Sequence, residues 1–66
     1  MQVTKDTIIG DILDFNSPAA APLFIENGMH CLGCPAARSE SVGEACNAHN
    51  VSPDELINKL NQVLNQ

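Results

Sequence analysis

The sequence predicts an all-α fold, a compact bundle of about four to five short helices forming a single small helical domain over residues 1–66. Apolar and polar residues nowhere alternate over the length of a strand, whereas several segments show helical spacing between recognisable start and stop signals. A chain of 66 residues has room for one small domain. We expect a thin, mainly aliphatic core, because Phe15 and Phe24 are the only aromatic residues.

The first two helices are predicted on either side of Phe15. The first begins after an N-cap at Asp6 or Thr7 and ends near Phe15. Ser17 and Pro18 then combine an N-cap with a proline at the first helical position. The second helix is expected to end at Asn27 and Gly28, where glycine can adopt the left-handed conformation. Pro22 predicts an irregular start or a bend in this helix. The apolar residues of the two helices are Ile8, Ile9, Ile12, Leu13, Leu23, Phe24 and Ile25.

Two capping boxes mark the second half of the chain. A short helical turn is expected over residues 35–38, and Ser41 and Glu44 have the spacing of a capping box that starts the next helix. Asn50 is its expected left-handed stop. The predicted buried stripe of this helix is Val42, Ala45, Cys46 and His49.

The last helix is predicted to start at Ser52 and Pro53, with Glu55 completing a second capping box. It has the clearest apolar face in the chain, which consists of Leu56, Ile57, Leu60, Val63 and Leu64.

The charge balance excludes several kinds of partner. The formal net charge is −5, and Lys5, Arg38 and Lys59 are the only certain cations. This composition has no basic patch for nucleic acid or for an anionic membrane surface. The sequence also has no secretory signal and no apolar run of the roughly 20 residues that span a membrane. We therefore expect a cytoplasmic protein.

The residues most relevant to function are Cys31 and Cys34, a Cys-x-x-Cys pair expected on a turn between the second and third helices. Two thiols at this spacing can close a short disulfide or bind one metal ion. Cys34 directly precedes the helical turn that begins at Pro35, where backbone N–H groups favour a thiolate. We hypothesise that Cys31 attacks a partner disulfide and that Cys34 resolves the mixed disulfide.

Two candidate cations lie near the pair in sequence. His30 adjoins Cys31, and Arg38 follows Cys34 by four positions, so either side chain could favour a thiolate. The alternative for each is a polar residue that faces solvent.

A metal site is the main alternative to redox chemistry. Cys31, Cys34, Cys46 and His49 together have a tetrahedral zinc spacing. Against this, Cys46 can be a small core residue, and His49 can bind carbonyl oxygens at a helix end. An iron–sulfur cluster would need ligands from a second chain. A plain protein-interaction domain is a further alternative.

Three segments together carry a family resemblance. Residues 7–13, 28–36 and 44–51 read TIIGDIL, GMHCLGCPA and EACNAHNV. In these segments the chain resembles the small hybrid-cluster-protein-associated redox disulfide domain of prokaryotes, which is classed as a domain of unknown function. The resemblance implies a compact helical bundle with a redox-active disulfide between Cys31 and Cys34.

The function expected from the sequence is a thiol–disulfide redox module, with oxidoreductase activity exerted through Cys31 and Cys34. Its partner would be another protein, including a redox protein, and not nucleic acid or a membrane. No cofactor is implied unless zinc or an iron–sulfur cluster occupies the cysteines. Both a monomer and a homodimer are compatible with the sequence.

Overall fold

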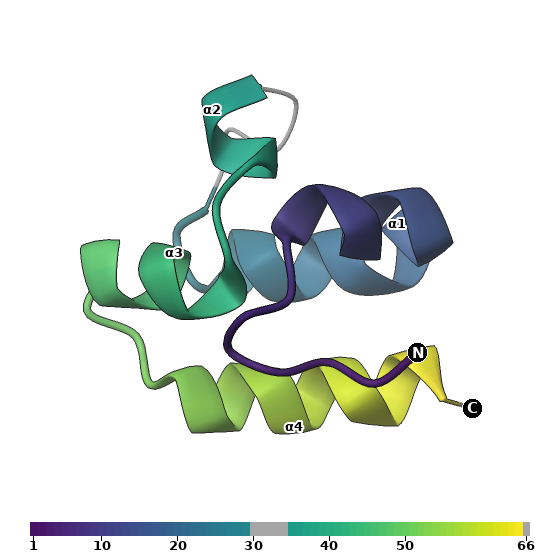
Figure 1. The fold of residues 1–66 in the computed structure, drawn as a ribbon. Helices are drawn as coiled ribbons and strands as arrows, with labels where there is room; N and C mark the ends of the chain where they lie inside the picture. Colours follow the sequence, from purple (N-terminus) through teal and green to yellow (C-terminus); the bar gives the residue numbers. More distant parts are fainter. Residues whose placement is uncertain (30–34, 66) are drawn as a thin grey trace.

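The computed structural model describes residues 1–29 and 35–65, and over these residues the fold is a small, mostly helical domain (Figure 1). It has four helices, which are α1 (Ile9–Glu26), α2 (Pro35–Arg38), α3 (Val42–Ala48) and α4 (Pro53–Leu64). Within the described part of the chain there is no strand, and the only extended pairing is an isolated bridge between Ile8 and Ser41. The prediction of an all-α fold is thus confirmed for these residues. The expected Cys-x-x-Cys turn lies outside them.

Helix α1 contains the first two predicted helices, joined through a kink. Asn16 is its one residue with non-helical dihedrals (φ −160°, ψ 79°), and in Figure 1 the chain turns back at the right-hand end of α1. The division after Phe15 is confirmed, but the break lies at Asn16 and the helical backbone continues through Pro18 and Pro22. The predicted first N-cap was wrong. Ile8 occupies that position without a side-chain cap, and the Thr7 hydroxyl accepts from the Thr4 backbone N–H instead.

The stop signals at Gly28 and Asn50 are confirmed. Gly28 has φ +86° and Asn50 has φ +55°, both in the left-handed region. After α3, the Val51 N–H donates to the Cys46 carbonyl (2.8 Å) and the Asn50 N–H to the Asn47 carbonyl (3.4 Å). These two bonds form a Schellman motif, which satisfies carbonyls that a helix end leaves free.

One of the two predicted capping boxes is present. The Ser41 hydroxyl accepts from the Glu44 N–H, and the Glu44 carboxylate accepts from the Ser41 N–H, each at 3.2 Å. Ser52 makes no side-chain cap bond, so the second capping box was wrong, although Pro53 does begin α4. His49 was also misplaced. It is the C-cap of α3, where the chain leaves the helix, and its side chain is exposed.

The core lies between α1, α3 and α4 and is closed by the N-terminal segment. Its largest fully buried side chains are Phe24, Ile12, Leu56, Leu60, Val3, Val42 and Cys46. Phe24 is the one buried aromatic residue, which confirms the aliphatic core. On α4, Leu56, Leu60 and Leu64 are buried while Ile57 and Val63 are half-buried, as the apolar face predicts.

The N-terminal segment, residues 1–6, runs beside α4 (Figure 1). The Asn61 side chain accepts from the Val3 N–H (2.8 Å) and donates to the Val3 carbonyl (3.1 Å). Farther along, the Lys5 carbonyl accepts from the Gly43 N–H (2.8 Å), and just beyond the segment the Thr7 carbonyl accepts from the Val42 N–H (2.9 Å). The segment is therefore bonded both to α4 and to the start of α3.

Candidate functional site

The predicted site residues Cys31 and Cys34 lie outside the described residues, as does His30. The structure does describe both flanks of this segment. On one side are the end of α1 and Met29, and on the other is α2, which begins at Pro35. The two ends of the chain that border residues 30–34 are therefore defined by the structure.

The N-terminal flank is a helix end bonded to the core. The Met29 N–H donates to the Phe24 carbonyl (3.1 Å) and the Gly28 N–H to the Ile25 carbonyl (3.0 Å), which is the bond pair of a Schellman motif. The Asn27 amide also donates to the Leu23 carbonyl at 2.7 Å. Met29 is buried together with Phe24, the hydrophobic contact that commonly accompanies this motif. The chain thus enters residues 30–34 from a fixed point in the core.

The C-terminal flank is bonded to the first half of α1. The Arg38 guanidinium donates to the Asp14 carboxylate and, at 3.4 Å, to the Gly10 carbonyl. Gly10 is buried against α2, so that a Cβ built on it would lie 2.8 Å from the Arg38 carbonyl oxygen. A side chain at position 10 would therefore push α2 away from α1.

These contacts change the interpretation of Arg38. The sequence offered it as a cation near the thiols or as a solvent-facing residue. In the structure its guanidinium is bonded to α1, and its side chain is 35% exposed beside the 71% exposed Asp14. Arg38 thus attaches α2 to α1. Because both side chains of the Arg38–Asp14 ion pair are partly exposed to solvent, the pair contributes little to stability.

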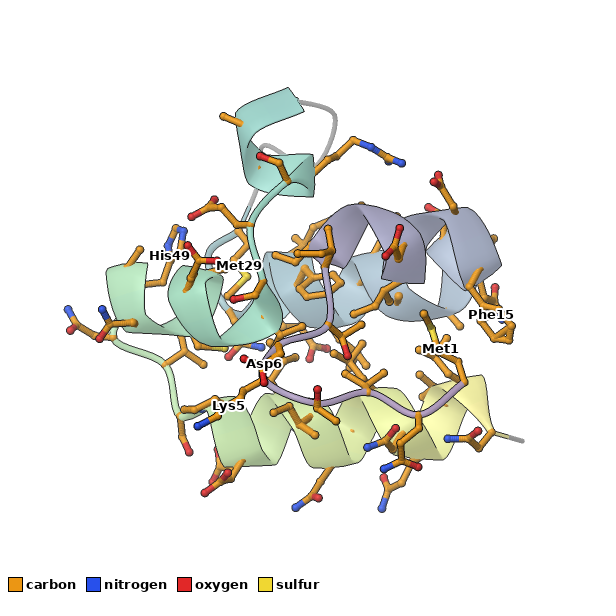
Figure 2. All side chains as sticks on the ribbon, in the orientation of Figure 1. Met1, Lys5, Asp6, Phe15, Met29 and His49 are labelled. Carbon is orange, nitrogen blue, oxygen red and sulfur yellow. The ribbon has the colours of Figure 1, made fainter. Side chains whose placement is uncertain are left out.

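His49 lies beside the N-terminal flank. A Cβ on Gly28 would be 3.9 Å from the His49 Nδ1, and Figure 2 shows His49 close to Met29. The side chain is exposed, contrary to the predicted buried stripe. It is thus positioned near the entry to residues 30–34, on the surface of the domain.

Cys46 has a different environment. It is 0% exposed in the core, and burial raises the pKa of its thiol above the ordinary value. A thiol of this kind is a poor nucleophile because little of it is thiolate near neutral pH. The prediction that Cys46 can serve as a small core residue is confirmed.

The zinc alternative is tested only in part. Among residues 1–29 and 35–65 no group of three or more His, Cys, Asp and Glu side chains is arranged to hold a metal ion. Two of the four proposed ligands, Cys31 and Cys34, lie outside that part of the chain. Of the other two, Cys46 is buried while His49 is exposed at the helix end, so the expected shared face on α3 is absent.

Sequence reasoning missed Gly10 and Asp14, which hold the C-terminal flank. Gly10 lies 28 positions from Arg38, and Asp14 lies 24 positions from it. No local pattern reports such contacts. The fact that Gly10 is a glycine near a helix start was the one available signal.

Fold and site together define a small all-helical domain that has a Cys-x-x-Cys pair between α1 and α2 in the sequence. A family model described as "Domain of unknown function (DUF1858)" matches residues 3–57, and the chain belongs to this family. No curated protein matches the chain. Among solved structures, it is similar to the NMR solution structure of a structural-genomics target from Clostridium thermocellum. The two are 48% identical with a TM-score of 0.79, over 94% of this chain and 87% of the other.

None of the helices in residues 1–29 and 35–65 has the combined length and apolarity needed to cross a membrane.

Proposed function

We propose that this domain is a thiol–disulfide redox module of a reducing, cytoplasmic compartment, which exchanges a disulfide with a partner protein through Cys31 and Cys34. The resemblance to the hybrid-cluster-associated redox disulfide domain supports the same chemistry. In this proposal Cys31 is the attacking thiol and Cys34 the resolving thiol.

The reaction is a two-step exchange. The Cys31 thiolate attacks one sulfur of the partner's disulfide, and the partner's other sulfur leaves as a thiolate. The Cys34 thiolate then attacks the Cys31 Sγ of the mixed disulfide and releases the partner's first sulfur. The partner gains two electrons and two protons and becomes a dithiol. The module is oxidised to the Cys31–Cys34 disulfide, and an external dithiol reductant would restore it.

The observation that carries the proposal is the attachment of both flanks of the cysteine segment. Met29 is buried in the core, and α2 is bonded to Gly10 and Asp14 through Arg38. Because the chain is anchored immediately before and shortly after the pair, the entropy lost in closing a disulfide there is smaller than in a free loop. Such a framework favours formation of a disulfide at these positions, as the proposed exchange requires.

The burial of Cys46 supports the same assignment. Its thiol is fully buried and has a raised pKa, so it is a poor competitor for exchange reactions. This leaves Cys31 and Cys34 as the two thiols to which the redox role is assigned.

The test is mass spectrometry of the protein after equilibration with oxidised and then reduced glutathione. We expect the native protein and Cys46→Ser to lose two hydrogens on oxidation and to regain them on reduction. Cys31→Ser and Cys34→Ser should instead form single glutathione adducts. With a disulfide-bonded peptide as the substrate, Cys34→Ser should accumulate a mixed disulfide at Cys31.

Cys46→Ser is the matched control, because it removes a thiol while leaving the pair intact. A two-hydrogen loss that required Cys46 would contradict the assignment of the pair. A native mass that retained zinc or iron through these steps would favour the metal-binding alternative. Structural disulfides typically have reduction potentials below about −300 mV. A Cys31–Cys34 disulfide with a reduction potential well below that value would therefore be a structural bond and not an exchanging one.

A further inference from the structure

Helix α1 carries the large exposed apolar side chains of the described residues. In the described residues, the two exposed large hydrophobic side chains are Phe15 at 53% and Ile25 at 46%, and both belong to α1. Pro18 and Pro22 lie between them and are exposed as well. Single exposed apolar residues are common on protein surfaces, but here four exposed apolar residues belong to one helix. We call these four residues the α1 apolar face.

Helical geometry places three of the four residues on one side of the second half of α1. With about 3.6 residues per turn, Pro18, Pro22 and Ile25 fall within an arc of about 60° around the helix axis. The buried residues of this half, Ala20 and Phe24, occupy the opposite side. Phe15 is the last residue before the kink at Asn16, and Figure 2 shows its side chain at that end of α1.

The charge pattern around this face selects the kind of partner. Between Phe15 and Ala37 the only Asp, Glu, Lys or Arg is Glu26, which is exposed beside Ile25. The first half of α1 adds Asp11 and Asp14, of which Asp14 is already paired with Arg38, so the charged groups of α1 itself are all carboxylates and Asp11 and Glu26 are the two considered for a partner. Basic side chains at the margin of a partner would complement them, and the net charge of −5 would speed the encounter.

The same charges argue against a second copy of this chain as the occupant. In a two-fold arrangement of α1 against α1, both copies contribute the same charged residues, and those of α1 are all carboxylates, so Glu26 would meet no basic side chain on the opposing helix. Two molecules that each carry a charge of −5 also repel one another before contact. An anionic lipid surface is disfavoured for the same reason.

We propose that the α1 apolar face is a docking surface for an amphipathic helix of a partner protein, one whose apolar side is flanked by lysine or arginine. The apolar side of that helix packs over Pro18, Pro22 and Ile25, with Phe15 at one end. Its basic residues pair with Glu26 and with Asp11. The proposal does not depend on redox activity.

The test is an NMR titration of the full, isotope-labelled chain with three probe peptides of equal length. One is an amphipathic Leu/Lys helix, the second has Glu in place of Lys, and the third has Ser in place of Leu. We expect the Leu/Lys peptide to shift the amide signals of residues 15–26 and to bind about tenfold more tightly than either of the others. Phe15→Ser combined with Ile25→Ser should weaken its binding by about tenfold or more.

Two carboxylate variants form the matched control. Glu26→Gln, beside the face, should weaken binding of the Leu/Lys peptide, whereas Glu55→Gln on α4 should leave it unchanged. Circular dichroism would establish that each variant keeps its helices. Signals that shifted around α4 instead, equal binding of the Ser/Lys peptide, or no binding of any peptide would overturn the proposal. A protein dimer in sedimentation that the Phe15→Ser, Ile25→Ser double variant dissolved would show that the occupant is a second copy and would also overturn it.

Discussion

Replacing Gly10 with alanine tests whether α2 is held against α1 as the structure indicates. Gly10 is the second residue of α1, is buried, and has φ outside the left-handed region, so alanine is allowed by the backbone. By helix propensity alone, Gly10→Ala would stabilise the protein by at most about 1 kcal/mol. The new Cβ, however, would lie 2.8 Å from the Arg38 carbonyl oxygen and 3.4 Å from the Arg38 Cβ.

The overlap is with main-chain atoms, which cannot rotate away as a side chain can. Overpacking of this kind costs about 1–3 kcal/mol, which exceeds the gain in propensity. We therefore expect Gly10→Ala to be about 1 kcal/mol less stable than the native protein. For a domain of this size that corresponds to a fall in melting temperature of roughly 4–8 °C.

The assay is urea and thermal unfolding followed by far-UV circular dichroism, with an NMR spectrum of the folded variant. Gly43→Ala is the matched control, because Gly43 is likewise the second residue of its helix, α3. Its Cβ would meet the Lys5 carbonyl oxygen at 3.1 Å, on the N-terminal segment, so we expect a smaller effect. If Gly10→Ala were as stable as the native protein and left the amide signals of α2 unchanged, the inferred packing of α2 on α1 would be wrong.

Further predictions concern the cap of α3, the N-terminal segment and the buried thiol. Ser41→Ala should cost about 1 kcal/mol in urea unfolding, since it removes a capping bond, whereas Ser52→Ala should be nearly neutral because Ser52 caps nothing. Asn61→Ala should cost about 1–3 kcal/mol and speed hydrogen exchange at the Val3 amide, because both bonds to Val3 are lost. Because burial raises the pKa of Cys46, its thiol stays protonated to a higher pH in the folded protein than in the unfolded chain. The contribution of the protonated thiol to the free energy of unfolding is therefore complete below the ordinary pKa of 9.0 and declines as pH rises above it. Unfolding measured across that range should show a shallower alkaline decline for Cys46→Ala, and identical slopes would contradict the assignment.

The parts of the fold that could be predicted from the sequence are those set by neighbouring residues. The left-handed stops at Gly28 and Asn50 and the capping box of Ser41 with Glu44 depend on contacts within a few positions. The apolar face of α4 follows from helical spacing alone. Local chemistry of this kind can be identified before any tertiary contact is known.

The wrong predictions share a different cause, which is that similar local patterns have different outcomes in different tertiary settings. Ser52 has the same capping-box spacing as Ser41, yet only Ser41 lies in the bridge to Ile8 that fixes its backbone. His49 was predicted to share a helix face with Cys46 because residue 49 was assumed to be helical, but α3 ends at Ala48.

The candidate site shows the same division. Cys31 and Cys34 could be named as candidates from sequence, because the spacing of two thiols is itself the chemical signal, and their role stays a prediction. The contacts that hold α2 against α1 could not be named from sequence, since Arg38 reaches Gly10 and Asp14 across 28 and 24 positions. Contacts at that separation depend on how the kink at Asn16 folds α1 back on itself.

The shortness of α2 explains why these distant contacts matter to the site. A helix of four residues has too few internal hydrogen bonds to be stable by itself, so its position must come from what it packs against. Here that surface is the first half of α1, and the attachment consists of a close main-chain approach at Gly10 and a partly exposed ion pair. The ion pair is weak in solvent, whereas the close approach depends on shape, which salt does not screen. The packing at Gly10, more than the charge of Arg38, should therefore determine where the chain leaves the cysteine segment.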